Sequence, residues 1–226
     1  MNHFFFSFLK EHFDNFTLRP PLFYLWRYGL RFEISMPWVE HQKRENLQQI
    51  KERSLGIFNH MFHDSDEMFL ITDIQCERTD PFLQKRPLKL YLNYVKDNEV
   101  IRKLQHRLLP SVFIEDEADE ECGEMVTHRF ILPCKKKDFR YQALLEAISY
   151  EDFPQPSQIA KGLSGNAKDV YFVNETKKMI YHLYDDRGCD VIAANKADLQ
   201  PLYDEFNDWI LDYDREKIDR LFNPKV

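Results

Sequence analysis

Residues 184–193, which read "YDDRGCDVIA", hold residue types that could do chemistry: three aspartates, an arginine and a cysteine within ten positions. Carboxylates that converge can coordinate Mg²⁺ or Ca²⁺, or act as an acid–base pair. However, Asp190 lies two residues past Gly188, which does not match the ligand spacing of a calcium loop, and no second carboxylate cluster is identifiable as a partner for this one. An enzyme that uses Asp185, Asp186 and Asp190, with or without a metal, is therefore the alternative hypothesis.

A tight turn between two strands explains the same stretch more simply. Asp185 and Asp186 favour the first turn positions through local side-chain hydrogen bonds, and Gly188 tolerates the positive φ that other residues avoid. Arg187 can neutralise the neighbouring carboxylates. We predict a turn with an exposed Asp-Asp-Arg tip, which could also contact charged groups of a binding partner.

A second candidate is the segment "HMFHDSDE" (60–67), in which two histidines precede two aspartates. His60, His63, Asp64 and Asp66 resemble a small metal-ligand set, but an H-x-x-H pair without a distant ligand is a weak signal. The segment also suits the end of a helix, where imidazoles interact well with the terminal carbonyls. We predict no metal here.

The remaining histidines, cysteines and glycines indicate no active site. His128 and His182 lie inside predicted strands, where we expect them to be packed and hydrogen-bonded, and Cys189 is expected to be a buried thiol rather than a reactive one. The four cysteines show no C-x-x-C spacing, which favours reduced thiols in a cytoplasm. No phosphate loop, dinucleotide fingerprint, G-x-S-x-G elbow or Ser-His-acid arrangement occurs, so we predict no cofactor.

Charge and hydropathy exclude two classes of partner. The net charge is −7, residues 115–121 carry six acids, and residues 142–226 hold 16 acidic against 10 basic residues. A nucleic-acid role would need a strong basic bias. The N-terminal "MNHFFFSFLKEHF" is too short an apolar run for a signal peptide, and no stretch approaches the ~20 apolar residues of a membrane span. We predict a cytoplasmic protein without nucleic-acid or membrane partners.

Hydrophobic periodicity predicts the elements that position these residues. Alternation over 29–36 predicts a strand, spacing of three and four over 39–62 predicts a helix that covers a sheet, and 67–75 reads as an interior strand. We assign 86–110 mainly as helix, 125–132 as strand, 139–150 as a helix capped by Asp138, and 153–169 as a loop. The order predicts one α+β domain over 1–226, with a mixed or antiparallel sheet.

The last third is the clearest part of the pattern. Strands over 170–174 and 178–184 form a hairpin at 175–177, and a third strand covers 190–194. Asp198 is predicted to cap a helix and Asp214 to cap a last short helix. The first of these helices has an apolar stripe of Leu199, Leu202, Phe206, Trp209, Ile210 and Tyr213, and the second carries Ile218, Leu221 and Phe222.

The two segments "YDDRGCDVIA" and "LYDEFNDWILDYDREKIDRLF" (202–222) resemble the C-terminal signature of a bacterial family, common in bacilli, whose domain has no known function. The resemblance is best over 169–222, extends over a core of 29–222 and is looser over 29–75, while 80–135 diverges and the acidic loop 115–124 looks particular to this chain. The residues that match the signature are Tyr184, Asp185, Asp186, Arg187, Gly188, Asp190, Asn207, Asp208 and Trp209. The hairpin-strand-helix ending is also similar to SUKH-type immunity proteins, which neutralise toxins in bacterial competition.

The family resemblance implies no established activity, so no catalytic residue is predicted. We predict a non-enzymatic protein-binding domain, with an immunity-type role as its narrower form and a basic protein as the partner. The candidate binding residues are Tyr184, Asp185, Asp186, Arg187, Asp190, Asp208 and Trp209. The oligomeric state does not follow from the sequence.

Overall fold

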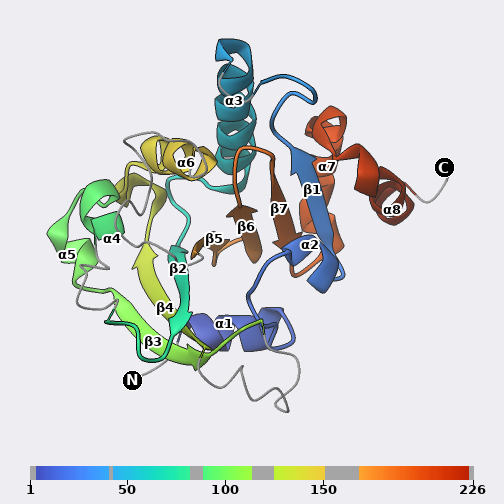
Figure 1. The fold of residues 1–226 in the computed structure, drawn as a ribbon. Helices are drawn as coiled ribbons and strands as arrows, with labels where there is room; N and C mark the ends of the chain where they lie inside the picture. The colour runs from blue at the N-terminus through green and yellow to red at the C-terminus, as the bar shows by residue number, and fades with distance from the viewer. Residues whose placement is uncertain (1–3, 41–42, 82–88, 114–124, 151–167, 224–226) are drawn as a thin grey trace.

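The computed structural model describes residues 4–40, 43–81, 89–113, 125–150 and 168–223. A seven-stranded sheet carries helices on both faces, which is the predicted α+β arrangement (Figure 1). The acidic loop 115–124, Cys122 and most of the predicted loop 153–169 lie outside the described residues.

The strands are β1 (Gly29–Glu33), β2 (Met68–Glu77), β3 (Gln105–Pro110), β4 (Met125–Cys134), β5 (Lys168–Asn174), β6 (Met179–Leu183) and β7 (Gly188–Ala193). The described helices are α1 (Phe4–His12), α2 (Leu22–Leu25), α3 (Arg44–Met61), α4 (Lys89–Tyr94), α5 (Asn98–Ile101), α6 (Tyr141–Ser149), α7 (Gln200–Glu205) and α8 (Asp212–Phe222).

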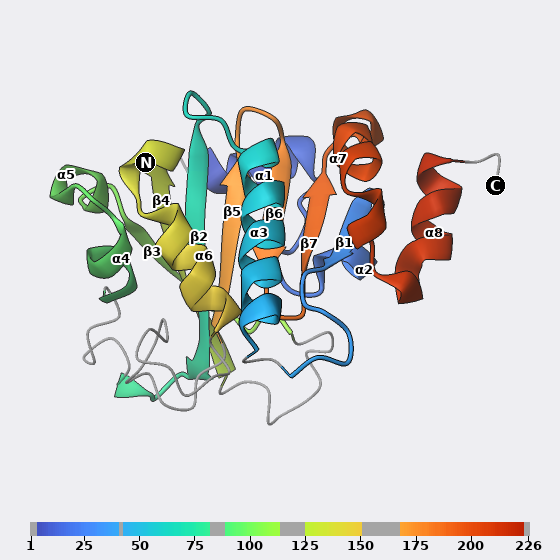
Figure 2. The ribbon, with the colours of Figure 1, turned by 90° about the horizontal axis from the view of Figure 1, so that it is seen from above.

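The sheet is antiparallel throughout, in the order β1-β7-β6-β5-β2-β4-β3. The predicted hairpin is β5–β6, and β7 then pairs with both β6 and β1. Because side chains alternate across a strand, each strand divides its residues between the two faces. Figure 2 shows the strands side by side, with α8 standing beyond the β1 edge.

Helices α3 and α6 cover one face of the sheet (Figures 1 and 2). The predicted stripe of α3 is buried there, and the Phe58 ring lies 5.1 Å from the Phe172 ring and 6.1 Å from the Tyr181 ring. Leu144, Leu145 and Ile148 of α6 complete this core. The prediction that the helix over 39–62 covers a sheet is confirmed.

Helices α1 and α2 cover the opposite face. Phe5, Phe8 and Leu9 are buried against the sheet, and the Phe5 ring lies 5.7 Å from the Phe69 ring of β2. The apolar N-terminal run that was tested as a targeting signal is therefore part of a second hydrophobic core. An amphipathic helix of nine residues is long enough to bury its apolar side in this way.

The helical assignment of 86–110 is wrong for its last part. In the described part of this segment, from residue 89 on, α4 and α5 are the helices, and Gln105–Pro110 is β3, the edge strand that pairs with β4. Side chains on β3 are all partly or fully exposed, so neither face is a clean apolar row. The period of two that normally identifies a strand is weak for this reason.

The predicted continuous stripe over 199–213 is also wrong. Helix α7 ends at Glu205, and the chain becomes extended at Ile210, which bridges to Phe32 of β1. The Leu211 N–H then donates to the Arg31 carbonyl at 3.0 Å. Pairing with the edge of β1 therefore interrupts the helix, and Tyr213 lies on the surface, 86% exposed.

None of the three predicted aspartate caps forms. The Asp138 carboxylate accepts a hydrogen bond from the Lys135 N–H at 2.7 Å, and Arg140 rather than Asp138 is the residue that precedes α6. Asp198 lies in a short 3₁₀ turn before α7, and Asp214 lies inside the first turn of α8. Asp138 binds a different backbone N–H, and Asp198 and Asp214 do not lie at the position before their helices. The preference of aspartate for helix caps therefore placed these helix starts wrongly.

Candidate functional site

The β6–β7 connection is the predicted tight turn. The Arg187 N–H donates to Asp185 Oδ1 at 2.8 Å, and Arg187 Nε donates to Asp185 Oδ2 at 2.8 Å. Asp185 and Asp186 are buried, and only Arg187 is exposed. The expectation of an exposed Asp-Asp-Arg tip is therefore wrong for the aspartates, because Asp185 turns inward to bind both the backbone and the guanidinium of Arg187.

Gly188 is required for a different reason from the one predicted. Its φ lies outside the left-handed region. A Cβ at this position would lie 2.4 Å from the Tyr184 hydroxyl and 2.5 Å from the Phe32 carbonyl oxygen, closer than real contacts allow. Glycine therefore allows the turn to approach β1, which pairs with β7 at Glu33 and Gly188.

Asp190 is a buried link between the two ends of the chain. Its Oδ1 accepts a hydrogen bond from Arg31 Nε at 2.9 Å, and its Oδ2 accepts one from the Phe23 N–H at 3.1 Å. Burial raises the pKa of Asp190, and the contact with Arg31 opposes that shift. Burial acts to lower the pKa of Arg31, but the Asp190 carboxylate outweighs it and raises that pKa.

Asp214 extends this link to α8. Its carboxylate accepts hydrogen bonds from the Tyr24 hydroxyl at 2.8 and 3.0 Å and lies 3.7 Å from Arg31 Nη1. The Arg31 guanidinium also lies over the Tyr24 ring, 4.8 Å from its centre, and 5.6 Å from the centre of the Tyr184 ring. Arg31 therefore joins α2, β1, β7 and α8.

The three carboxylates of the candidate cluster do not converge on a cation. Asp185 pairs with Arg187 and Asp190 pairs with Arg31, so these two carboxylates neutralise different cations. Among the described residues, no three His, Cys, Asp or Glu side chains are placed to hold a metal ion. Burial raises the pKa of the Cys189 thiol, which fits the expected buried structural cysteine.

A buried polar group lies next to Asp190 on the α1–α2 face. His182 pairs with Asp190 across β6 and β7, is 1% exposed, and lies 3.2 Å from an oxygen of Asp169 without hydrogen-bond geometry. The Tyr171 ring lies 4.5 Å from the His182 ring, and its hydroxyl has no hydrogen-bond partner. His182 is packed as predicted, but the predicted hydrogen bond is absent in the described part of the chain.

The second candidate segment ends helix α3, as expected from the sequence. His60 Nδ1 lies 2.7 Å from a Glu205 carboxylate oxygen of α7. Asp66 Oδ2 accepts hydrogen bonds from the His63 N–H at 2.9 Å and from Asn174 Nδ2 at 2.8 Å. These contacts are those of a helix terminus tied to neighbouring elements.

The candidates Asp208, which is exposed, and Trp209, which is half-buried against the core, lie on a surface that sequence periodicity did not predict. The Arg53 guanidinium lies 5.4 Å from the centre of the Trp209 ring, and its Nη1 donates to the Glu33 carbonyl oxygen at 2.8 Å. Burial raises the pKa of the Glu33 carboxyl; Arg53 opposes this shift, and Asp212 adds to it.

We call this region the acidic–aromatic surface. It comprises Glu33, Asp208, Trp209, Asp212 and Tyr213. The exposed Arg187 adjoins it, because its carbonyl oxygen accepts a hydrogen bond from Ile34, the residue after Glu33.

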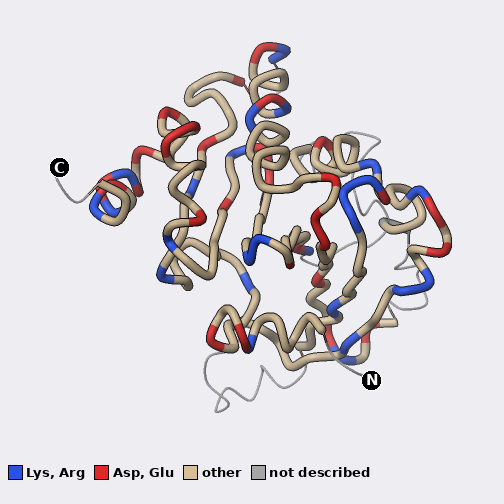
Figure 3. Tube along the Cα trace, turned by 180° about the vertical axis from the view of Figure 1, so that it is seen from behind, with Lys and Arg blue, Asp and Glu red and all other residues tan. Residues whose placement is uncertain are grey.

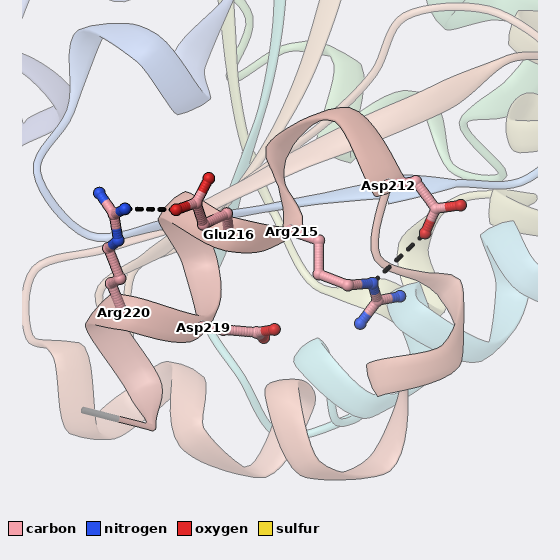
Figure 4. Close-up of a pocket in the computed structure, with 5 residues that line it drawn as sticks. All are labelled: Asp212, Arg215, Glu216, Asp219 and Arg220. Carbon is pink, nitrogen blue, oxygen red and sulfur yellow. Dashed lines mark hydrogen bonds and ion pairs between the residues drawn. The ribbon is translucent and has the colours of Figure 1, made fainter. Parts of the chain in front are cut away.

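Helix α8 forms the outer part of this surface. Five of its charged residues line a shallow groove of about 520 Å³, namely Asp212, Arg215, Glu216, Asp219 and Arg220 (Figure 4). Arg215 Nε is paired with Asp212 at 3.3 Å, and Arg220 is paired with Glu216. Figure 3 shows acidic residues along α7 and α8, interspersed with basic residues on α8.

Sequence reasoning missed Arg31, Glu33 and Arg53 as parts of this region. Arg31 and Glu33 were the polar positions of an alternating strand, and such positions are normally solvent-facing. The detectable signal was the separation of charge between a first part that is mildly basic apart from the acidic loop 115–121 and an acidic last part of the chain. The ion pair of Arg31 with Asp190 and the contact of His60 with Glu205 join those two parts.

None of the described helices is both long and apolar enough to span a bilayer. No solved structure matches the chain. The chain is 33% identical to the uncharacterised protein YnaE of Bacillus subtilis (strain 168) over 213 residues, which cover 92% of this chain and 97% of YnaE.

Residues 5–214 match the family model described as a domain of unknown function, DUF3885. That match starts within α1, so it includes the two N-terminal helices as well as the sheet and the β6–β7 turn. The expected resemblance to a bacterial family without a known function is confirmed. The chain belongs to the DUF3885 family.

Proposed function

We propose that this chain is a protein-binding domain and that its partner binds at the acidic–aromatic surface. The observation that carries the proposal is an aromatic side chain displayed among carboxylates at the start of α8. Tyr213 is 86% exposed, and the side chain of its neighbour Asp212 is 96% exposed. Tyrosine and tryptophan supply much of the binding energy in protein interfaces, so their display on a polar surface favours recognition.

The charge of this region favours a basic partner. Residues 196–223 contain eight acidic and four basic residues. Complementary charge mainly raises the association rate and excludes wrong partners, while desolvated aromatic contacts hold the complex. A basic protein segment therefore fits this surface better than an acidic one.

The candidate binding residues divide into two roles. The exposed Asp208 and Arg187 contact the partner, together with Asp212, Tyr213 and the accessible part of the Trp209 side chain. The other candidates support this surface from within, by fixing the turn and the adjacent edge of β1; these are Tyr184, Asp185, Asp186 and Asp190. Substitution of the buried set would therefore weaken binding through misfolding as well as through lost contacts.

Neutralisation of a toxin is the narrower form of this proposal. The hairpin, strand and helices over β5, β6, β7 and α7 have the order that carried the similarity to immunity proteins. An acidic surface suits a basic toxin. We place the interaction in the cytoplasm, because Cys76, Cys134 and Cys189 are buried free thiols. On this reading, the captured partner is toxic when expressed alone and harmless when co-expressed with this chain.

Affinity capture with matched charge variants tests the proposal. The baits are the unchanged chain, Asp208→Lys/Asp212→Lys, and Glu11→Lys as a control on the exposed side of α1. We expect one stoichiometric basic protein with the unchanged chain and the control, and its loss with the surface variant. Direct titration of the identified partner should then show at least about tenfold weaker binding to the surface variant.

Two outcomes would contradict the proposal. One is a partner that the surface variant retains at full affinity. The other is the absence of any partner for all three baits, once circular dichroism has shown that each is folded. An enzyme based on Asp185, Asp186 and Asp190 is not favoured, since Asp185 forms an ion pair with Arg187 and Asp190 forms one with Arg31.

A further inference from the structure

A groove on the side of the molecule away from the acidic–aromatic surface has the features of a small-molecule site. Its volume is about 360 Å³. One wall comes from α1 and the turn after it, and the other from the end of β3; they consist of Phe6, Leu9, Asn15, Phe16, Thr17, Leu109, Pro110, Ser111 and Val112. Most of this lining is apolar, as is usual for ligand sites, with a few polar groups at the edge.

Arg129 of β4 also lines this groove, and its side chain is only 3% exposed. Its Nε donates to Asp73 Oδ1 at 2.8 Å, and its Nη2 donates to Asp73 Oδ2 and to the Leu18 carbonyl oxygen. Within the described chain, Nη1 has no acceptor. Nη1 is not fully enclosed by protein, so at the groove it can donate to a ligand oxygen in place of water.

The pairing with Asp73 determines which acceptor suits this donor. Because the Asp73 carboxylate already neutralises the guanidinium, a second carboxylate would bring an uncompensated negative charge into a partly buried groove. A carbonyl oxygen accepts from an N–H without that cost, as the Leu18 carbonyl does at 2.7 Å on Nη2. The remaining donor therefore fits an uncharged acceptor.

The backbone beside the groove is held in an uncommon conformation. Asp14 and Asn15 both have positive φ, at 50° and 59°, in the turn that carries the Asn15 and Phe16 side chains to the groove. The Asn15 N–H donates to the Leu9 carbonyl oxygen at 3.1 Å, which fixes this turn to the end of α1. Such a turn holds one wall of the groove rigidly, and rigid walls reduce the entropy that binding costs.

We propose that this groove binds a small, uncharged molecule with an apolar body and a carbonyl oxygen, and that Arg129 Nη1 donates to that oxygen. The apolar body packs between Phe6 and Phe16 on one side and Leu109 and Val112 on the other. Amides, esters and lactones of short acyl chains have this chemistry. This inference is independent of the protein-binding proposal, because it uses a different part of the molecule.

Calorimetric titration with hexanamide and with hexanoate, which differ in the charge of the head group, tests the inference. The first variant is Thr17→Trp, which fills the groove from an exposed position. The second is Arg129→Lys, which keeps a positive charge beside Asp73 but removes the guanidinium and with it the Nη1 donor. Thr79→Trp, in an exposed turn after β2, is the control for adding an indole to the surface.

We expect saturable hexanamide binding at one site, unchanged in Thr79→Trp and weakened at least about tenfold in Thr17→Trp and Arg129→Lys. Hexanoate should bind at least about tenfold more weakly than hexanamide. The inference is overturned by equal or tighter binding of hexanoate, by hexanamide binding that Thr17→Trp leaves intact, or by no binding at millimolar concentration. Thr17→Trp decides the question even if Arg129→Lys does not fold.

Discussion

Asp185, Arg187 and Gly188 form the β6–β7 turn through contacts that leave little room for substitution. Asp185 binds the backbone and side chain of Arg187, and Gly188 lies too close to Phe32 and Tyr184 to carry a side chain. Residue type was enough to predict a turn, because aspartate and glycine have strong local preferences. It was not enough to predict that the aspartates are buried, since that depends on the neighbouring strand β1.

Replacement of Gly188 by alanine should destabilise the fold by about 1–3 kcal/mol, the usual cost of forcing an extra methyl group into a filled space. The free energy of urea unfolding measures the effect. The double variant Gly188→Ala/Tyr184→Phe should recover only part of the loss, because the Phe32 carbonyl oxygen still lies 2.5 Å from the added Cβ. A variant as stable as the unchanged chain would show that β1 can move away freely.

His106 and His128 make a second residue-level prediction, on pH. Their rings are stacked, with His106 Nε2 2.9 Å from His128 Nδ1. Burial lowers the pKa of both, and the charge of His106 lowers that of His128 further. The unfolded chain, with a histidine pKa of about 6.5, binds these protons more readily than the folded chain. Their contribution to stability is therefore complete above that pH and is lost as the pH falls below it.

Urea unfolding at pH 7.5 and pH 5.5 tests this prediction. The unchanged chain should lose more stability on acidification than His106→Phe/His128→Leu, in which neither side chain titrates. His63→Gln, at an exposed position, serves as the control and should follow the unchanged chain. Equal losses in the unchanged chain and the double variant would assign the acid sensitivity to other groups.

At the scale of elements, α1 completes the fold by covering a sheet face that would otherwise be exposed. Its buried phenylalanines pack with Phe69, Ile71 and Tyr171 of the strands. The DUF3885 match begins at residue 5, so this helix is included in the family domain. The apolar side chains of this segment are therefore part of the hydrophobic core.

Phe8→Ala should therefore cost about 3–5 kcal/mol of unfolding free energy, as expected for deletion of a buried phenylalanine ring. Phe4, in the same helix, is 63% exposed, and Phe4→Ala should change stability by no more than about 0.5 kcal/mol. Chemical denaturation of the two variants compares them directly. If both have the stability of the unchanged chain, α1 is not an integral part of the core.

At the scale of the whole molecule, buried ion pairs join segments that are far apart in sequence. Arg31 links to Asp190 and Asp214, so the first strand is tied to the last strand and the last helix. Part of the charge difference between the two halves of the chain is thus neutralised by ion pairs within the molecule. The carboxylates that remain exposed around α7 and α8 are those available to a partner.

Asp190→Ala should cost about 3–5 kcal/mol, because it leaves the largely buried Arg31 guanidinium without its main anion. The double variant Arg31→Met/Asp190→Leu should recover much of that loss, since an apolar pair carries no unpaired charge. Hydrogen exchange should show faster opening of α2 and β1 in the single variant. Comparable losses in the single and double variants would mean that packing, not charge, sets the cost.

The sequence by itself determined the α+β class, the helix over α3, the β5–β6 hairpin, the β6–β7 turn and the family. Each of these follows from local periodicity, turn chemistry or a contiguous motif. Only the tertiary structure decided that Gln105–Pro110 is an edge strand and that the chain unwinds at Ile210, because both depend on pairing with distant strands. The same applies to the candidate site: Asp190 was predicted as a binding residue and Arg31 was only a polar strand position, whereas folding brings their charged groups within 2.9 Å of each other. Burial and long-range pairing are properties of three-dimensional neighbours, which one sequence does not specify.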